Sequence, residues 1–151
     1  MDQLKVLLIE DNEGDIFLFK EALESWNMVN PLQIARNGQE AMSYFNKLET
    51  NQISSKPDLI FLDINLPFIN GIDLLKYIKF HQQFKNIPIV MLTSCDLEFE
   101  INETFKHYAC HYIVKPLNGT DFSNDIAQVL SKWKQIADLP NVNPMNLVYH
   151  A

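Results

Sequence analysis

The sequence of 151 residues has few cysteines and few glycines, and it has no long hydrophobic run. Its two cysteines, Cys95 and Cys110, form no CxxC pair and have no histidines at zinc-ligand spacing, so a disulfide framework is excluded and both are interpreted as reduced core thiols. The four glycines are isolated, so the chain lacks the GxGxxG and Walker loops that bind phosphates. No apolar run approaches the roughly twenty residues that cross a bilayer, and we expect no membrane span and no membrane partner.

Positive charge is also scarce. The chain has 12 Lys and Arg against 19 Asp and Glu, which gives a net charge of −7 and a sequence pI near 4.9. An acidic chain of this kind repels polyanions, so nucleic acid is not an expected partner. The N-terminal residues lack the basic start and the longer apolar stretch of a secretory signal, and we therefore expect a cytoplasmic protein.

The sequence contains instead a series of short apolar runs rich in β-branched residues, which are typical of parallel strands buried on both faces. These predicted strands lie at residues 6–9, 32–35, 59–62, 89–92 and 112–114. Segments with the spacing of amphipathic helices lie between and after them, at residues 16–26, 40–48, 72–78, 97–108 and 122–133. The alternation predicts an α/β fold, a three-layer sandwich in which helices cover both faces of a doubly wound, five-stranded parallel sheet.

The length of the chain predicts one domain, which we place at residues 1–137. Residues 138–151 are predicted to form a C-terminal tail, because Pro140 and Pro144 prevent a long continuous helix there. We expect no separate effector domain.

Polar residues follow four of the predicted strands at the point where each strand ends. Glu10 and Asp11 follow the first strand and Asp63 follows the third, while Thr93 and Lys115 follow the fourth and fifth. Because the carboxyl ends of parallel strands meet at one edge of a sheet, we expect these side chains to lie together. Three carboxylates in one place repel one another unless a cation neutralises them, and oxygen ligands favour Mg²⁺. A lysine beside such a metal supplies a positive charge for a phosphoryl oxygen.

Each of these residues also has a simpler interpretation. A Glu-Asp pair after a strand is ordinarily a helix cap or a solvated loop, and a lysine at a strand end is ordinarily a solvated cation. Independent loop polarity seldom puts acids, a hydroxyl and a lysine on successive strand ends in this order. The combination therefore favours a site.

From Leu4 to Trp133 the chain resembles the receiver domain of two-component response regulators. The matching motifs are Leu7-Leu8-Ile9-Glu10-Asp11-Asn12, Leu62-Asp63-Ile64-Asn65-Leu66-Pro67 with Asn70-Gly71, Leu92-Thr93-Ser94, and Tyr112-Ile113-Val114-Lys115-Pro116. The resemblance implies a flavodoxin-like sheet with strand order 2-1-3-4-5, the order of the chemotaxis receiver. The long polar loop before Asp63 and the ending Leu139-Pro140 are similar to the stand-alone regulators paired with bacterial phytochromes.

The resemblance also implies roles for the acidic residues. Asp63 is expected to be the phosphoacceptor, a carboxylate nucleophile that forms an aspartyl phosphate. Asp11, Asp63 and the backbone carbonyl of Asn65 are expected to bind Mg²⁺, and Glu10 to act through a coordinated water.

The remaining motif residues are implied to sense the phosphoryl group. Lys115 is expected to contact it, the Thr93 hydroxyl to move toward it after transfer, and Tyr112 to turn inward as an aromatic switch. Two departures from the family pattern are Tyr108-Ala109, where Gly-Ala is frequent, and Ser94, where Ala is frequent. Ser94 adds a hydroxyl near the site and could change the lifetime of the phosphate.

These expectations describe a signalling protein that catalyses only its own phosphotransfer and a slow autodephosphorylation. Its phosphoryl donor is expected to be a sensor histidine kinase, of the phytochrome type by the finer resemblance, and its output to be a contact with another protein. We predict that this contact uses the face formed by residues 97–108, 112–114 and 122–133. The apolar residues of the tail indicate a homodimer or a tail that folds back on its own domain.

Two other functions fit parts of the same pattern. A phosphohydrolase of the haloacid dehalogenase type shares an Asp nucleophile, a Thr, a Lys and Mg²⁺, but it carries a second Asp two residues after the nucleophile, where this chain has Asn65. A flavin-binding protein needs a phosphate loop after the first strand, where this chain has the acids Glu10 and Asp11.

Overall fold

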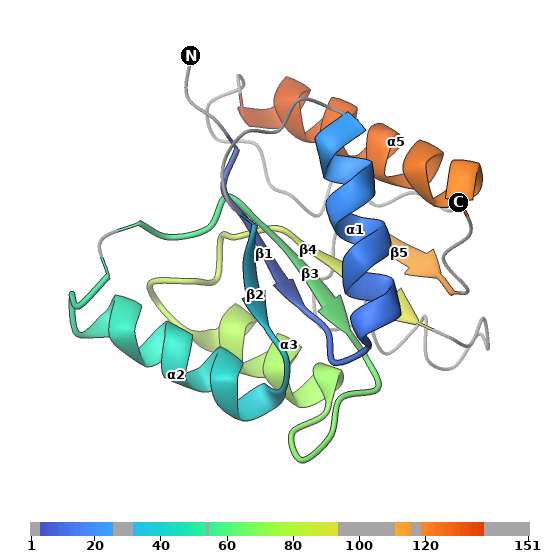
Figure 1. Ribbon diagram of the computed structural model, residues 1–151. Coiled ribbons are helices and arrows are strands. Elements are labelled where there is room, and N and C mark those ends of the chain that lie inside the picture. Colours follow the sequence, from blue (N-terminus) through green and yellow to red (C-terminus); the bar gives the residue numbers. More distant parts are fainter. Residues whose placement is uncertain (1–3, 26–31, 54, 94–110, 116–118, 138–151) are drawn as a thin grey trace.

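The computed structural model describes residues 4–25, 32–53, 55–93, 111–115 and 119–137 (Figure 1). Within these residues strands and helices alternate along the chain as predicted, except that the segment between β4 and β5 lies outside the described residues. The elements are β1 (Val6–Ile9), α1 (Glu13–Ser25), β2 (Gln33–Ala35), α2 (Gly38–Glu49), β3 (Leu59–Asp63), α3 (Gly71–Phe80), β4 (Ile89–Thr93), β5 (His111–Val114) and α5 (Gly119–Ala137).

The five strands form one parallel sheet in the order β2-β1-β3-β4-β5, which confirms the predicted strand order. The strand order reverses between β1 and β3, so the segments that follow these two strands run to opposite faces of the sheet. Within the register, Ile9 is the partner of Leu62 and Thr93 is the partner of Val114. The ends of β1, β3, β4 and β5 therefore reach the same edge of the sheet.

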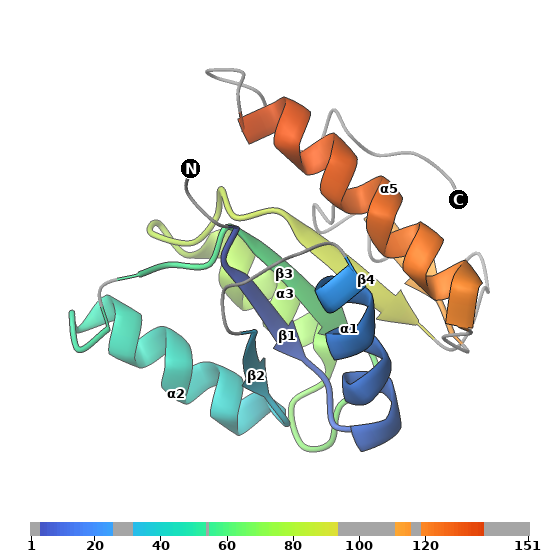
Figure 2. The ribbon, with the colours of Figure 1, turned by 45° about the horizontal axis from the view of Figure 1, so that its top comes forward.

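Helices cover both faces of the sheet, with α2 and α3 on one face and α1 and α5 on the other (Figures 1 and 2). On the α1 and α5 face, the ring centroid of Phe19 lies 4.7 Å from that of Phe61 and 5.0 Å from that of Phe122. On the α2 and α3 face, the centroids of Phe45 and Phe84 are 5.0 Å apart. These rings are buried, and the strands between the two clusters are buried almost throughout, as their continuous apolar runs predict.

The structure departs from the predicted boundaries mainly at the helices, and each described helix begins earlier than predicted. The Asn37-Gly38 pair has the sequence of a turn, but Gly38 begins α2 because the Asn37 side chain accepts a hydrogen bond of 2.8 Å from the Glu40 N–H. Asn70 caps α3 in the same way, with a bond of 2.9 Å from the Asp73 N–H. Helix α5 extends beyond the predicted 122–133 at both ends.

Several expectations concern residues outside the described part of the chain. These are the helix at 97–108, the tail at 138–151, Ser94, and the two cysteines. Among the described residues, none of the helices has both the length and the hydropathy to cross a membrane.

The loop between β3 and α3 has an unusual backbone. The Ile69 N–H donates to the Pro67 carbonyl over 2.9 Å, which closes a three-residue γ-turn around Phe68. Phe68 has a φ of 69°, in the region that bulky residues rarely adopt, and its side chain is 84% exposed. The loop ends at Gly71, where an added Cβ would lie 2.2 Å from the backbone oxygen of Asp63. Helix α3 therefore begins in direct contact with the last residue of β3.

Candidate functional site

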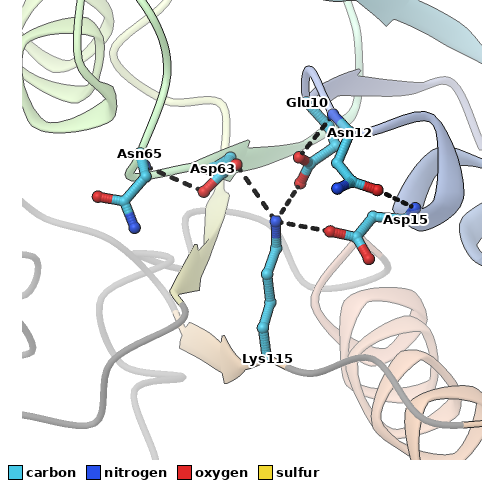
Figure 3. Close-up of polar contacts among 6 residues, drawn as sticks. All are labelled: Glu10, Asn12, Asp15, Asp63, Asn65 and Lys115. Atoms are coloured by element: carbon cyan, nitrogen blue, oxygen red, sulfur yellow. Dashed lines mark hydrogen bonds and ion pairs between the residues drawn. The ribbon is translucent and has the colours of Figure 1, made fainter.

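Lys115 is the centre of the polar edge of the sheet (Figure 3). Its Nζ atom lies 2.8 Å from Glu10 Oε2, 2.8 Å from Asp15 Oδ2 and 3.2 Å from Asp63 Oδ2. The three carboxylates come from the end of β1, the first turn of α1 and the end of β3, and Lys115 itself follows β5. One ammonium thus joins three parts of the chain that are far apart in the sequence: the β1–α1 connection, the end of β3, and the end of β5, where Lys115 itself lies.

The carboxylates of Glu10, Asp11 and Asp63 form a compact group, in which one oxygen from each lies within 4.8 Å of the others. Glu10 and Asp63 are buried, while Asp11 is exposed. Glu10 Oε2 lies 2.8 Å from the Lys115 ammonium, but the angles of this contact are not those of a hydrogen bond. None of the described residues donates a hydrogen bond to this buried atom. An oxygen of this kind is suited to a cation or to water bound to one.

Burial and charge shift the pKa values of the two central groups. Burial raises the pKa of Glu10 to about 7, and the negative charge of Asp63 adds to this shift while Lys115 opposes it. Burial of the Lys115 ammonium lowers its pKa, but the contacts with Asp15 and Glu10 and the charge of Asp63 outweigh it, so the pKa of Lys115 lies above its usual value. Lys115 is therefore a permanent cation, and Glu10 is poorly stabilised as an anion.

The donor set fits a hard divalent cation. Three carboxylates and one ammonium leave the group with excess negative charge, and hard oxygen donors are the ligands that Mg²⁺ and Mn²⁺ take. Asp11, being exposed, also leaves the group open to water and to an incoming phosphate.

Local structure fixes the residues that flank the acids. After β1, the Asn12 backbone N–H donates to Glu10 Oε1 over 3.2 Å, and the Asn12 side chain accepts from the Asp15 N–H over 2.9 Å at the start of α1. After β3, the Asn65 N–H donates to Asp63 Oδ1 over 3.0 Å. The turn after each of these strands thus uses a backbone N–H to orient a carboxylate of the site.

The two other predicted residues lie on β4 and β5. Thr93 is buried at the end of β4, and its carbonyl accepts a hydrogen bond of 2.6 Å from the Lys115 N–H. This bond joins the backbone of the hydroxyl residue to that of the lysine. Tyr112 is 9% exposed and packs with the apolar cluster on the α2 and α3 face. Its expected role as a switch stays a prediction.

Asp15 is the one contact of Lys115 that the sequence did not predict. Its position in the first turn of a helix was unremarkable, because acids are common there as caps and as partners of the helix dipole. Asp11 lies before α1 and Asp15 within it, so no helical spacing linked Asp15 to the acids at the strand ends, and no local pattern signalled its contact with Lys115.

Comparisons with known proteins agree with this geometry. The sequence profile of the response regulator receiver domain matches residues 6–127. Response regulator Rcp1 of Synechocystis sp. is 31% identical over 135 residues, which cover 89% of this chain and 92% of that protein.

Two solved structures extend the likeness to the fold. The phosphorylated cyanobacterial phytochrome response regulator RcpA has a TM-score of 0.82 and 33% identity, and the match covers 93% of this chain and 100% of that one. The Mn²⁺-bound form of Rcp1 has a TM-score of 0.77 and 31% identity, over 90% of this chain and 99% of that one. With a family profile that spans most of the sequence and relatives that match nearly end to end, the chain belongs to the response regulator receiver family.

Proposed function

We propose that this chain is a single-domain response regulator of a two-component phosphorelay, in which Asp63 accepts a phosphoryl group from a histidine kinase. The observation that carries the proposal is the position of the buried Asp63 carboxylate, 3.2 Å from Lys115 Nζ and grouped with the carboxylates of Glu10 and Asp11. Phosphoryl transfer needs little from a protein beyond positioning and charge, and this edge of the sheet supplies both.

In the proposed reaction a carboxylate oxygen of Asp63 attacks the phosphorus of a phosphohistidine. A P–O bond to Asp63 forms as the P–N bond breaks, and the imidazole of the donor leaves with the bonding electron pair. The Lys115 ammonium offsets the charge on the phosphoryl oxygens. The Asn65 N–H, which donates to Asp63 Oδ1, holds the nucleophile in a fixed direction.

The metal in this proposal is Mg²⁺, held by Asp11, Asp63 and the backbone carbonyl of Asn65, with Glu10 acting through a water. When bound, it neutralises the carboxylates and the transferring phosphoryl oxygens. The open Asp11 side and the buried Glu10 Oε2, which accepts no hydrogen bond from the described residues, support this assignment. The solved structure of the relative Rcp1 in a Mn²⁺-bound form supports it as well.

The output is proposed to be a conformational switch toward a protein partner. Lys115 and Thr93 are joined through their backbones, so a displacement of either residue toward a phosphoryl group is transmitted to the ends of both β4 and β5. Tyr112, two residues before Val114 on β5, is the side chain proposed to report this shift.

The wider setting stays a set of predictions. They are a cytoplasmic location, a phytochrome-type sensor histidine kinase as donor, an unidentified protein target, a homodimer, and a domain boundary at residue 137. The phosphohydrolase and flavin alternatives gain no support from the receiver family.

The test of the proposed function is a mass measurement after incubation with acetyl phosphate and Mg²⁺. We expect the wild type to gain one phosphoryl group and Asp63→Asn to gain none. Asp58→Asn is the matched control, because Asp58 precedes the same strand at its opposite end and its oxygen accepts the Lys5 N–H, a role that an amide oxygen retains. Phosphate uptake by Asp63→Asn, or uptake by the wild type with a chelator in place of Mg²⁺, would contradict the proposal.

The switch is tested separately with Lys115→Ala and Thr93→Ala. Both variants are expected to accept phosphate from acetyl phosphate but to lose the amide chemical-shift changes around Tyr112 that accompany phosphorylation of the wild type. Wild-type shift changes in both variants would show that these residues do not couple the phosphoryl group to β5.

A further inference from the structure

Asp15 is a third carboxylate on Lys115, and neither the receiver motifs nor the proposed reaction uses it. Its Oδ2 atom lies 2.8 Å from Lys115 Nζ, as close as Glu10 Oε2 and closer than Asp63 Oδ2. We propose that Asp15 is a positioning residue that holds the Lys115 ammonium between α1 and Asp63 and thereby restrains phosphorylation of Asp63. This inference rests on the proposed function and concerns the regulation of the same site.

The start of α1 fixes where Asp15 can reach. The Asn12 side chain accepts from the Asp15 N–H over 2.9 Å, and the Asn12 carbonyl accepts from the Ile16 N–H over 3.0 Å. Asp15 is thus anchored by its backbone in the first turn, and its side chain extends toward Lys115 across the gap between α1 and β5 (Figure 3). The contact depends on how α1 lies against the sheet.

Asp15 differs from Glu10 in its surroundings. The Glu10 side chain is completely buried, whereas the Asp15 side chain is 20% exposed and the Lys115 side chain 14% exposed. Water can therefore replace Lys115 as the partner of Asp15 when the ammonium moves, and it cannot do so for Glu10. Of the three carboxylates, Asp15 is the one that can release the ammonium with the smallest desolvation penalty.

Sharing the ammonium has opposite effects on a cation and on an anion at the site. While Asp15 draws Lys115 toward α1, less positive charge stands beside Asp63, which favours Mg²⁺ and disfavours an incoming phosphoryl group. Without Asp15, the ammonium is shared by Glu10 and Asp63 alone and moves toward Asp63. Removal of Asp15 therefore weakens Mg²⁺ binding and accelerates phosphorylation at saturating Mg²⁺.

Glu13 provides a control for charge alone. It lies in the same first turn of α1 but pairs with Arg36, with 2.6 Å between Arg36 Nε and Glu13 Oε1. Glu13→Gln removes the same charge from the same turn as Asp15→Asn and leaves the contacts of Lys115 in place. Asp15→Glu keeps the carboxylate and is the conservative variant.

The experiment compares wild type, Asp15→Asn, Asp15→Glu and Glu13→Gln by three measurements. Calorimetric titration with Mg²⁺ is expected to show about threefold weaker binding to Asp15→Asn, and the rate of mass gain with acetyl phosphate at saturating Mg²⁺ is expected to rise about threefold, effects of the size of one partly exposed ion pair. A metal-free crystal structure of Asp15→Asn is expected to show Lys115 Nζ closer to Asp63 Oδ2. Asp15→Glu and Glu13→Gln are both expected to keep the Mg²⁺ affinity, the phosphorylation rate and the Lys115 position of the wild type.

The inference is overturned if Asp15→Asn matches the wild type in rate and Mg²⁺ affinity, if Glu13→Gln changes them equally, or if both change while Lys115 keeps its position. A wild type that gains no phosphoryl group overturns the proposed function instead. In that case the crystal structure and the Mg²⁺ titration still decide whether Asp15 sets the position of Lys115.

Discussion

The two faces of the sheet and its charged edge differ in how their side chains are stabilised. On the faces, rings such as Phe19, Phe61 and Phe45 are fully buried against apolar neighbours and need nothing from outside the chain. At the edge, the carboxylates of Glu10, Asp15 and Asp63 surround the ammonium of Lys115, and the carboxylate of Asp11 adds a further negative charge beside Glu10 and Asp63. The faces hold the fold, and the edge carries unbalanced charge that a further cation can neutralise. Removal of a buried ring should therefore lower stability on the faces, whereas removal of a carboxylate should raise stability or leave it unchanged at the edge.

The largest change in stability is expected from the centre of the α1 and α5 face. Phe19→Ala removes a fully buried ring that contacts Phe61 and Phe122, and it should lower the free energy of unfolding by about 3–5 kcal/mol. The measurement is urea denaturation at neutral pH. Phe17→Ala is the matched control on the same helix, because the Phe17 side chain is 60% exposed and its loss should change stability by less than about 0.5 kcal/mol. Equal losses in the two variants would contradict the difference in packing.

The next effect is a dependence of stability on pH that arises at the edge. The pKa of Glu10 is raised to about 7 in the folded chain from 4.5, so the folded state keeps the proton while the unfolded state loses it between these values. The metal-free chain should therefore lose stability as pH rises from about 4.5 to about 7, by on the order of 1–3 kcal/mol.

This pH effect is measured by thermal unfolding in the presence of a chelator. Glu10→Gln should lack that component of the pH dependence, because the amide has no proton to lose in this range. If the metal-free stability of the wild type changes with pH in the same way as that of Glu10→Gln over this interval, the buried Glu10 carboxyl does not cause the predicted loss of stability.

A smaller and opposite effect is expected from Asp11. Asp11→Ala removes one charge from the carboxylate group and should raise metal-free stability by about 1 kcal/mol, while greatly reducing phosphorylation by acetyl phosphate. Mg²⁺ should stabilise this variant less than it stabilises the wild type. Glu21→Ala, an exposed acid in the middle of α1, serves as the control. If Asp11→Ala is phosphorylated at the wild-type rate, Asp11 does not bind the metal.

The smallest effect concerns the backbone beside the site. Phe68→Gly removes the strain of a positive φ in the γ-turn, which stabilises the folded state. The greater flexibility of glycine in the unfolded chain offsets part of this gain, so the free energy of unfolding should rise by about 0.5–1 kcal/mol. Asn51→Gly is the control, because Asn51 also has a positive φ, of 62°, but asparagine tolerates this conformation. Chemical denaturation of both variants distinguishes them, and a loss of stability in Phe68→Gly would mean that the exposed ring packs on its loop in solution.

The sequence predicted the two regions unequally. Continuous apolar runs such as residues 59–62 identify buried parallel strands, and the residue after each run then falls at the carboxyl edge by geometry alone. The proximity of Glu10, Asp11 and Asp63 was predictable for this reason. The contact of Asp15 with Lys115 was not, because it depends on the tilt of α1 against β5, which no local pattern encodes.

The starts of the helices were predicted inaccurately for a related reason. The predicted start of α2 relied on apolar periodicity, which cannot detect a first turn made of polar residues and glycine. The cap at Asn37 sets the start instead, through one hydrogen bond from the Glu40 N–H. Helix α5 likewise begins with Gly119 and Thr120, before its first apolar residue.

Gly71 has a consequence for engineering the loop between β3 and α3. Any side chain at this position would collide with the backbone of Asp63 and Ile64, so a substitution must displace either helix α3 or Asp63, the proposed phosphoacceptor. Phe68, three residues earlier, is mostly exposed and can be replaced without such a collision. Loop grafting or library design should therefore vary the exposed Pro67 and Phe68 and keep Ile69, which packs against the core. Gly71 should also stay unchanged, since diversity introduced at that glycine would act on the position of Asp63 and not on the exposed surface of the loop.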